Sequence, residues 1–209
     1  NMTLEKQDAE LFYQLWFPLL DFVNQKYRVC PGTGTIDRSR GVDAADAKKI
    51  ADYLWSHTQV LQEYLAQAKL PEEQAQIVAG WAQCKPGKYI MERHLKKGTV
   101  FISEDDQTVY MVEGLFSTWE EMMGKGPVLL DAVLIPFKDM IISDGLVRAY
   151  PFHFGRGYSE AFKDIYRKAK EDNTIRFSLS GGEPERRPNK EKEIGTVVMK
   201  WQNANSRDY

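Results

Sequence analysis

The stretch VLLDAVLIPFKDMIISDGL at residues 128–146 consists of two apolar runs joined by a short polar corner and closed by Asp144-Gly145. Apolar runs bounded by turn residues are typical of β-strands, and Asp-Gly is a pair that favours tight turns. Because the runs are nearly continuous, we expect both faces of the strands to be covered, one by further strands and one by helices. The stretch therefore predicts a buried β-hairpin around which the rest of the chain packs.

Residues 85–112 show the two-residue period of additional strands. Apolar Tyr89, Met91 and Leu95 alternate with polar side chains, and residues 97–98 and 104–107 have the composition of turns. We expect an antiparallel meander here, then a short helix at residues 119–123, then the hairpin, which residues 147–154 continue. Together these segments predict a highly twisted sheet of about five or six strands. It either closes into a small barrel or stays open with helices behind it.

Residues 3–84 have the period of α-helices instead. Apolar residues recur every three or four positions, and Thr3 is a candidate N-cap for the first helix. Pro18 lies inside the first helical pattern, so we expect that helix to kink or divide near it. Further helix starts near residues 43, 56 and 71 predict a helical region of about four elements.

The segment after the sheet predicts one more helix and a polar tail. Phe154-Gly155-Arg156-Gly157-Tyr158 reads as a turn into a helix capped by Ser159, and residues 175–179 read as a short strand. We expect an α+β fold in which a helical region at residues 1–84 packs, as one unit, on an antiparallel sheet with two helices at residues 85–180. We expect residues 181–209 to form a flexible segment with a candidate edge strand.

Composition narrows the classes of protein to consider. The chain has 209 residues, a formal net charge of −2 and two cysteines, Cys30 and Cys84. So small a charge creates no field that would concentrate nucleic acid or an anionic membrane, and two distant cysteines make neither a disulfide framework nor a paired zinc motif. No apolar run reaches the roughly 20 residues that span a bilayer, and the first residues lack the layout of a signal peptide. We expect a soluble cytoplasmic protein with no membrane partner.

Four residues are candidates for ligand binding: Arg148, His153, Arg156 and Tyr158, which cluster in the sequence around the predicted end of the sheet. A Gly-Arg-Gly segment that opens a helix can hold an anion through backbone N–H groups and a cation. It lacks the third glycine or the P-loop lysine of the nucleotide fingerprints, however, and two glycines suit a plain turn equally well. Basic and aromatic side chains at a barrel rim are also typical of proteins that bind single-stranded nucleic acid.

The sequence predicts no catalytic residue, metal ligand or cofactor. His57, His94 and His153 lack the spacing of metal-binding motifs, and no base lies close in sequence to either cysteine to favour a thiolate. Asp139 and Asp144 can be pictured as two carboxylates on one rim. Turn formation explains them better, because aspartate is common in tight turns.

The hairpin resembles a phrase found in uncharacterised bacterial proteins that have a helical front half. The likeness rests on LIPFK at residues 134–138, II at residues 141–142 and DGL at residues 144–146, with a looser likeness from Tyr89 onward. Those proteins often carry glycine where this chain has Asp139, which leaves the turn type open. The resemblance implies a bacterial source and a shared fold, and it transfers no catalytic residues.

These observations leave three functional hypotheses. The first is a non-enzymatic intracellular module that binds a ligand, a protein partner or a second copy of itself, because a complete fold is visible and a catalytic set is not. The second is a nucleic-acid-binding accessory protein that uses Arg148, His153 and Arg156. The third is a small hydrolase or transferase whose site converges on His153, Arg156 and Asp144.

Overall fold

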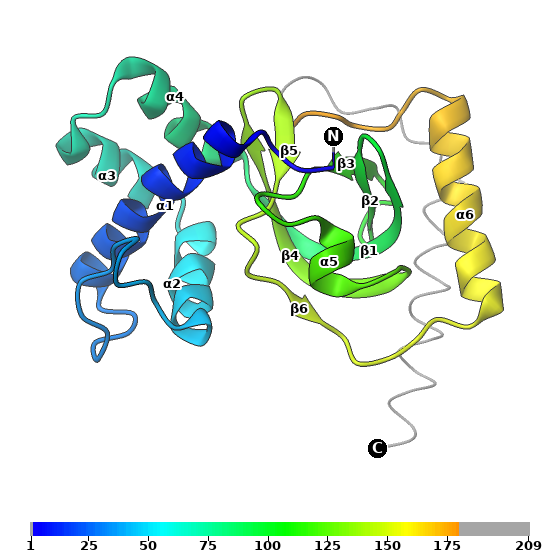
Figure 1. Cartoon of the computed structure of the whole chain (residues 1–209), viewed down its shortest axis with the longest axis horizontal. Coiled ribbons are helices and arrows are strands. Elements are labelled where there is room, and N and C mark those ends of the chain that lie inside the picture. The colour runs from blue at the N-terminus through cyan, green and yellow to red at the C-terminus, as the bar shows by residue number, and fades with distance from the viewer. Residues whose placement is uncertain (1, 180–209) are drawn as a thin grey trace.

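The structure is a computed structural model that describes residues 2–179 of the chain (Figure 1). The flexible segment and edge strand expected at residues 181–209 lie outside the described residues. Helices come first, a curled antiparallel sheet follows, and a further helix follows the sheet, so the expected α+β fold is confirmed. Within the described part, no helix has both the length and the apolar character needed to cross a bilayer.

The helical region begins with the longest helix, α1 (Lys6–Tyr27), whose buried face repeats at three and four residues. Pro18 lies on the exposed side of α1, and the helix runs through it without dividing, so of the two expected alternatives the division is excluded. Three shorter helices and a 3-10 turn complete the region: α2 (Ala44–Ser56), α3 (Val60–Ala68), α4 (Glu72–Gly80) and η1 (Trp81–Gln83).

The sheet confirms both the expected meander and the expected hairpin. Its strands are β1 (Lys85–Leu95), β2 (Gly98–Ser103), β3 (Val109–Val112), β4 (Val128–Phe137), β5 (Met140–Ile142) and β6 (Arg148–Ala149). They run in the order β3-β2-β1-β4-β5, β6 also pairs with β4, and all of these pairings are antiparallel. The β4–β5 hairpin turns at Lys138-Asp139, where Lys138 has a φ of 54°.

The sheet curls into a half-barrel (Figure 1). Buried side chains fill its concave face. Alternate residues of different strands meet there, among them Phe101 of β2 and Leu130 of β4. The short helix α5 (Trp119–Met123) inserts Trp119 into this interior, with its ring 4.9 Å from that of Phe101. At one end the two edges of the sheet meet, since the Glu113 backbone N–H donates to the Ile141 carbonyl over 2.9 Å. The fold therefore lies between the barrel and the open sheet that the sequence left as alternatives.

Helices cover the convex face of the sheet on two sides (Figure 1). Leu129 of β4 belongs to a cluster with Phe162 of α6 (Arg156–Glu171), whereas Ile135 and Phe137 of the same strand pack against the N-terminal helices. Both faces of the hairpin are thus covered, as its composition predicts. The inner cover is the curl of the same sheet, because β1 pairs edge to edge with β4 instead of packing across its face.

Three local expectations need correction. The N-cap of α1 is Glu5, and Thr3 instead forms a bridge with Gly114 beyond the end of β3, so tertiary pairing replaces the expected cap. Helix α6 starts at Arg156 with Gly155 as its N-cap, so Ser159 lies inside the helix. The strand expected at residues 175–179 is reduced to one bridge, between Arg176 and Tyr110 of β3.

Candidate binding pocket at Asp144

Asp144 lies in the loop at residues 143–147, which joins β5 to β6. Both of these strands pair with β4. Ile142 pairs with Ile135 and Arg148 pairs with Asp131, so the five residues 143–147 lie opposite only the three residues 132–134. The two extra residues force the chain away from the strand, as the extra residue of a β-bulge does. Gly145 takes a φ of 79° in this loop, a left-handed conformation that suits glycine.

The loop folds back on the Asp144 carboxylate. The Leu146 backbone N–H donates to Asp144 Oδ1 over 2.9 Å, which is the local bond by which aspartate stabilises a turn. Asp144 has an exposed fraction of only 5%, whereas Asp139 at the hairpin corner is exposed. The two carboxyl groups therefore lie in different environments, and Asp144 is the one that enters the interior.

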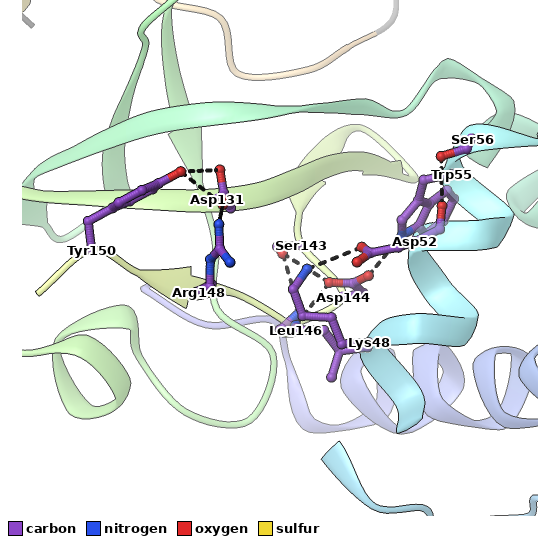
Figure 2. Close-up of polar contacts among 11 residues, drawn as sticks. Lys48, Asp52, Trp55, Ser56, Asp131, Ser143, Asp144, Leu146, Arg148 and Tyr150 are labelled. Carbon is purple, nitrogen blue, oxygen red and sulfur yellow. Dashed lines mark hydrogen bonds and ion pairs between the residues drawn. The ribbon is translucent and has the colours of Figure 1, made fainter. Parts of the chain in front are cut away.

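The other oxygen of Asp144 is held by the helical region. The Trp55 indole N–H of α2 donates to Asp144 Oδ2 over 2.9 Å, across 89 residues of sequence (Figure 2). The Trp55 ring in turn stacks on Trp16 of α1 at a centroid distance of 5.6 Å. Lys48 also lies on α2, but its ammonium forms an ion pair with Asp52 at 3.1 Å. Asp144 is thus bonded by two N–H donors, while the ammonium group of Lys48 pairs with Asp52.

Burial controls the electrostatics of this carboxyl group. Removal from water raises the pKa of Asp144 to about 6, although the hydrogen bonds from Trp55 and Leu146 favour the charged form. Lys48 lowers the pKa and Asp52 raises it, both by charge alone. A buried acid with such a pKa changes charge close to neutral pH, which is typical of functional sites.

Asp144 lies in the wall of a pocket of about 360 Å³ between α1, the start of α2, the segment that follows β3, and the loop at residues 143–146. Most of the lining is apolar or aromatic: Tyr13, Trp16, Phe17, Leu20, Val42, Ala44, Ala47, Leu115, Phe116, Trp119, Met122 and Leu146. Glu113 is the other acidic residue of the lining, and burial raises its pKa too. The pocket is of the size and character that small ligands occupy in proteins.

A second, more polar cleft of about 510 Å³ lies on the other side of the same loop. Asp144 and Leu146 line both cavities, so the loop is the wall between them. The charged side chains of the second cleft are of both signs: Lys48, Asp52, Lys88, Asp131, Asp144 and Arg148. Their charges nearly balance, which gives this cleft no clear preference for an anion or a cation.

Arg148, the first residue proposed from the sequence, lines this second cleft and is already paired. It lies opposite Asp131 across the β4–β6 pairing, and its guanidinium is 2.8 Å from the Asp131 carboxylate (Figure 2). The Tyr150 hydroxyl donates to the same carboxylate over 3.1 Å. This cross-strand ion pair accounts for Arg148 without a ligand.

The structure does not bring the other three proposed residues to either cavity. The side chains of His153 and Arg156 are exposed and form no hydrogen bond or ion pair within residues 2–179. Tyr158 is half-buried, with its ring 6.0 Å from Phe154 against the α6 cluster. The segment that joins β6 to α6 runs away from α2, whereas Asp144 is bonded to α2 (Figure 1).

Both thiols and the imidazole groups of His57 and His94 are engaged in structural contacts. Burial raises the pKa of the Cys84 thiol to about 11 and raises that of Cys30 as well, so neither thiol favours the nucleophilic form. Both ring nitrogens of His94 make hydrogen bonds, to Thr99 and to the Gly124 carbonyl. Among residues 2–179 there is no group of three His, Cys, Asp or Glu side chains placed to hold a metal ion.

The residues of the pocket were not singled out from the sequence, except for Asp144. The one available signal was the Asp144-Gly145 pair that closes the second apolar run, and this pair has an adequate explanation as a turn. Comparison with protein-family models, with curated proteins and with solved structures gave no match to this chain.

Proposed function

We propose that this protein is a non-catalytic binding module for a small, largely apolar ligand that occupies the pocket beside Asp144. The observation that carries the proposal is the combination of a 360 Å³ apolar and aromatic cavity with one buried carboxyl group of perturbed pKa. Such a combination is the usual appearance of a ligand site, in which apolar walls supply affinity and a few polar groups fix orientation.

We favour binding over catalysis because the hydroxyl closest to Asp144 in the sequence has a structural role. Ser143 is buried, and its Oγ accepts a hydrogen bond from the Gly145 backbone N–H over 3.2 Å. Its contact with Asp144 Oδ1 is 3.5 Å, which is long for activation of a nucleophile by a base. The carboxyl group is therefore assigned to recognition.

We place the site at this pocket and not at the end of the sheet, because Arg148 is paired with Asp131 and the aromatic rings after β6 pack on the α6 cluster. As part of the same proposal we assign the protein to a bacterial cytoplasm. Two observations support this assignment: the two cysteines are free thiols, and the hairpin sequence resembles that of uncharacterised bacterial proteins.

The proposal is tested by titrating the full chain with the neutral probe 2-phenylethanol while following tryptophan fluorescence, since Trp16 and Trp119 both line the pocket. We expect saturable binding in the millimolar range or tighter. Ala44→Phe, which adds a ring to an exposed lining position at the start of α2, should weaken binding about tenfold or more by occupying the cavity.

The matched control is Ala45→Phe, which adds the same ring to the neighbouring exposed residue outside the lining. It should bind 2-phenylethanol as the unmodified chain does, and circular dichroism should show both variants folded. Equal binding by the two variants would contradict the pocket as the site, and a chain that shows no saturable signal would contradict the proposed function.

A further inference from the structure

The charges that line the Asp144 pocket are of one sign. Asp144 and Glu113 both contribute carboxyl groups, and none of the lining residues is Lys, Arg or His. The second cleft, on the far side of the loop, has both signs. The two cavities thus share Asp144 but differ in charge, and only the apolar one is selectively acidic.

The aromatic side chains of the lining also favour a cationic ligand. Tyr13, Phe17 and Phe116 all line the pocket, and the Tyr13 and Phe116 rings stack in parallel at 5.7 Å. Phe116 has an exposed fraction of 47%, so this stack reaches the pocket mouth. Faces of aromatic rings attract cations as well as apolar groups, and the Arg38 guanidinium already lies 5.9 Å from the Tyr13 ring.

We propose that the ligand of this pocket is an organic cation, an amine with an apolar body, whose ammonium group pairs with Asp144 while the body lies against Tyr13, Phe17 and Phe116. This inference rests on the proposed function and gives its ligand a chemical class. A bound ammonium would supply the charge partner that the buried carboxylate lacks, and pairing is what makes a buried charge tolerable.

The charged and titratable groups around Asp144 set the pH dependence of such binding. They are Lys48 and Asp52 on α2, Tyr13 on α1 with Arg38 near its ring, Cys84 before β1, and Glu113 after β3, the other carboxyl group of the pocket. The Lys48–Asp52 pair is nearly neutral as a unit, so the charge of Asp144 dominates. With an Asp144 pKa of about 6, the ionised fraction rises about tenfold between pH 5 and pH 8, and the affinity for an amine rises with it.

The test compares 2-phenylethylamine with 2-phenylethanol, which has nearly the same shape and no charge, by calorimetry on the full chain at pH 5 and pH 8. We expect the amine to bind about tenfold or more tightly than the alcohol at pH 8, where a desolvated ion pair adds to the apolar contact. The preference should shrink about tenfold at pH 5. Asp144→Asn should lose both the preference for the amine and its pH dependence, whereas Ala45→Phe, which lies outside the lining, should keep both.

The outcomes separate this inference from the proposed function. Equal affinities for amine and alcohol at pH 8, or a preference that stays the same at pH 5, overturn the amine assignment and leave the pocket as a neutral ligand site. A lack of binding by both probes overturns the proposed function itself. If Asp144→Asn does not fold, the pH dependence of the unmodified chain decides, and Glu113→Gln checks that the other lining carboxyl is not responsible.

Discussion

At the scale of single residues, the buried carboxyl group of Asp144 is a feature that lowers the stability of the fold when it is ionised. Its carboxyl group is buried and bonded by Trp55 and Leu146, and no lysine or arginine within residues 2–179 forms an ion pair with it. A buried carboxylate without a counter-charge costs free energy, which is why its pKa is raised. Ionisation of Asp144 should therefore oppose folding.

This residue predicts a specific pH dependence of stability. The folded-state pKa of Asp144 is about 6, above the ordinary value of 3.8, so the stabilising contribution of its protonated form is complete below 3.8 and is lost as the pH rises through 6. Relative to Asp144→Asn, the free energy of unfolding of the unmodified chain should fall by about 1 kcal/mol between pH 5 and pH 8. Urea denaturation of both proteins at the two pH values measures this difference.

Asp139→Asn serves as the control for that comparison, since it removes an exposed carboxyl group from the corner of the same hairpin. The pH dependence of its unfolding should match that of the unmodified chain. The assignment would be contradicted if the free energy of unfolding of the unmodified chain, relative to that of Asp144→Asn, stayed constant or rose between pH 5 and pH 8.

At the scale of elements, the pocket depends on short segments that have little stability of their own. Helix α5 has five residues, too few to be stable in isolation, yet it supplies Trp119 and Met122 to the pocket lining. Its start is fixed by Thr118, whose Oγ1 accepts a hydrogen bond from the Glu121 backbone N–H over 3.1 Å. The short helix expected at residues 119–123 is confirmed with these bounds.

Loss of this cap should lower both the free energy of unfolding and the affinity of the pocket for its ligand. We expect Thr118→Ala to lower the free energy of unfolding by about 1 kcal/mol, because one backbone N–H of the first turn loses its acceptor. It should also weaken 2-phenylethanol binding, since α5 forms part of the wall. Thr118→Ser keeps the hydroxyl and should behave nearly as the unmodified chain in urea denaturation and in the binding titration; equal losses in both variants would mean that the cap is not the cause.

Local signals also explain which elements were predictable. The two-residue period of β1 to β3 and the apolar runs of β4 and β5 reflect burial against a sheet interior, and they were sufficient to place these strands. The start of α6 was misplaced, because Gly155-Arg156-Gly157 reads as a turn although the chain continues it as helix. Glycine tolerates both conformations, so only the packing of Phe162 and its neighbours settles the choice.

At the scale of the whole molecule, β4 joins the helical region to the half-barrel. Phe137 at its end is fully buried and packs edge to face on Phe12 of α1 at 6.4 Å, while Leu130 and Leu134 of the same strand fill the concave interior. One strand thus contributes side chains to both cores. Because a change in either core alters the environment of β4, we expect the two parts to unfold together.

Phe137→Ala tests this expectation. Loss of a fully buried ring should lower the free energy of unfolding by about 3 to 5 kcal/mol. If the molecule is one cooperative unit, hydrogen exchange should accelerate by similar factors in peptides from α1 and in peptides from β1 and β2. Phe177→Ala, which removes a ring with an exposed fraction of 50%, should change neither measurement by much. Acceleration confined to the helical peptides would show two independent units.

The sequence by itself determined the α+β class, the helical region, the meander and the buried hairpin, because these depend on the period of apolar residues along the chain. It also pointed to a site formed by Arg148, His153, Arg156 and Tyr158, because they lie close together in the sequence. Closeness in sequence is a weaker guide to closeness in the folded structure. Only the tertiary structure decided that Asp144 meets Trp55, and that α1, α2 and the segment after β3 enclose a pocket around it. The physical reason is that burial and pKa depend on contacts across 89 residues of chain, which no local pattern records.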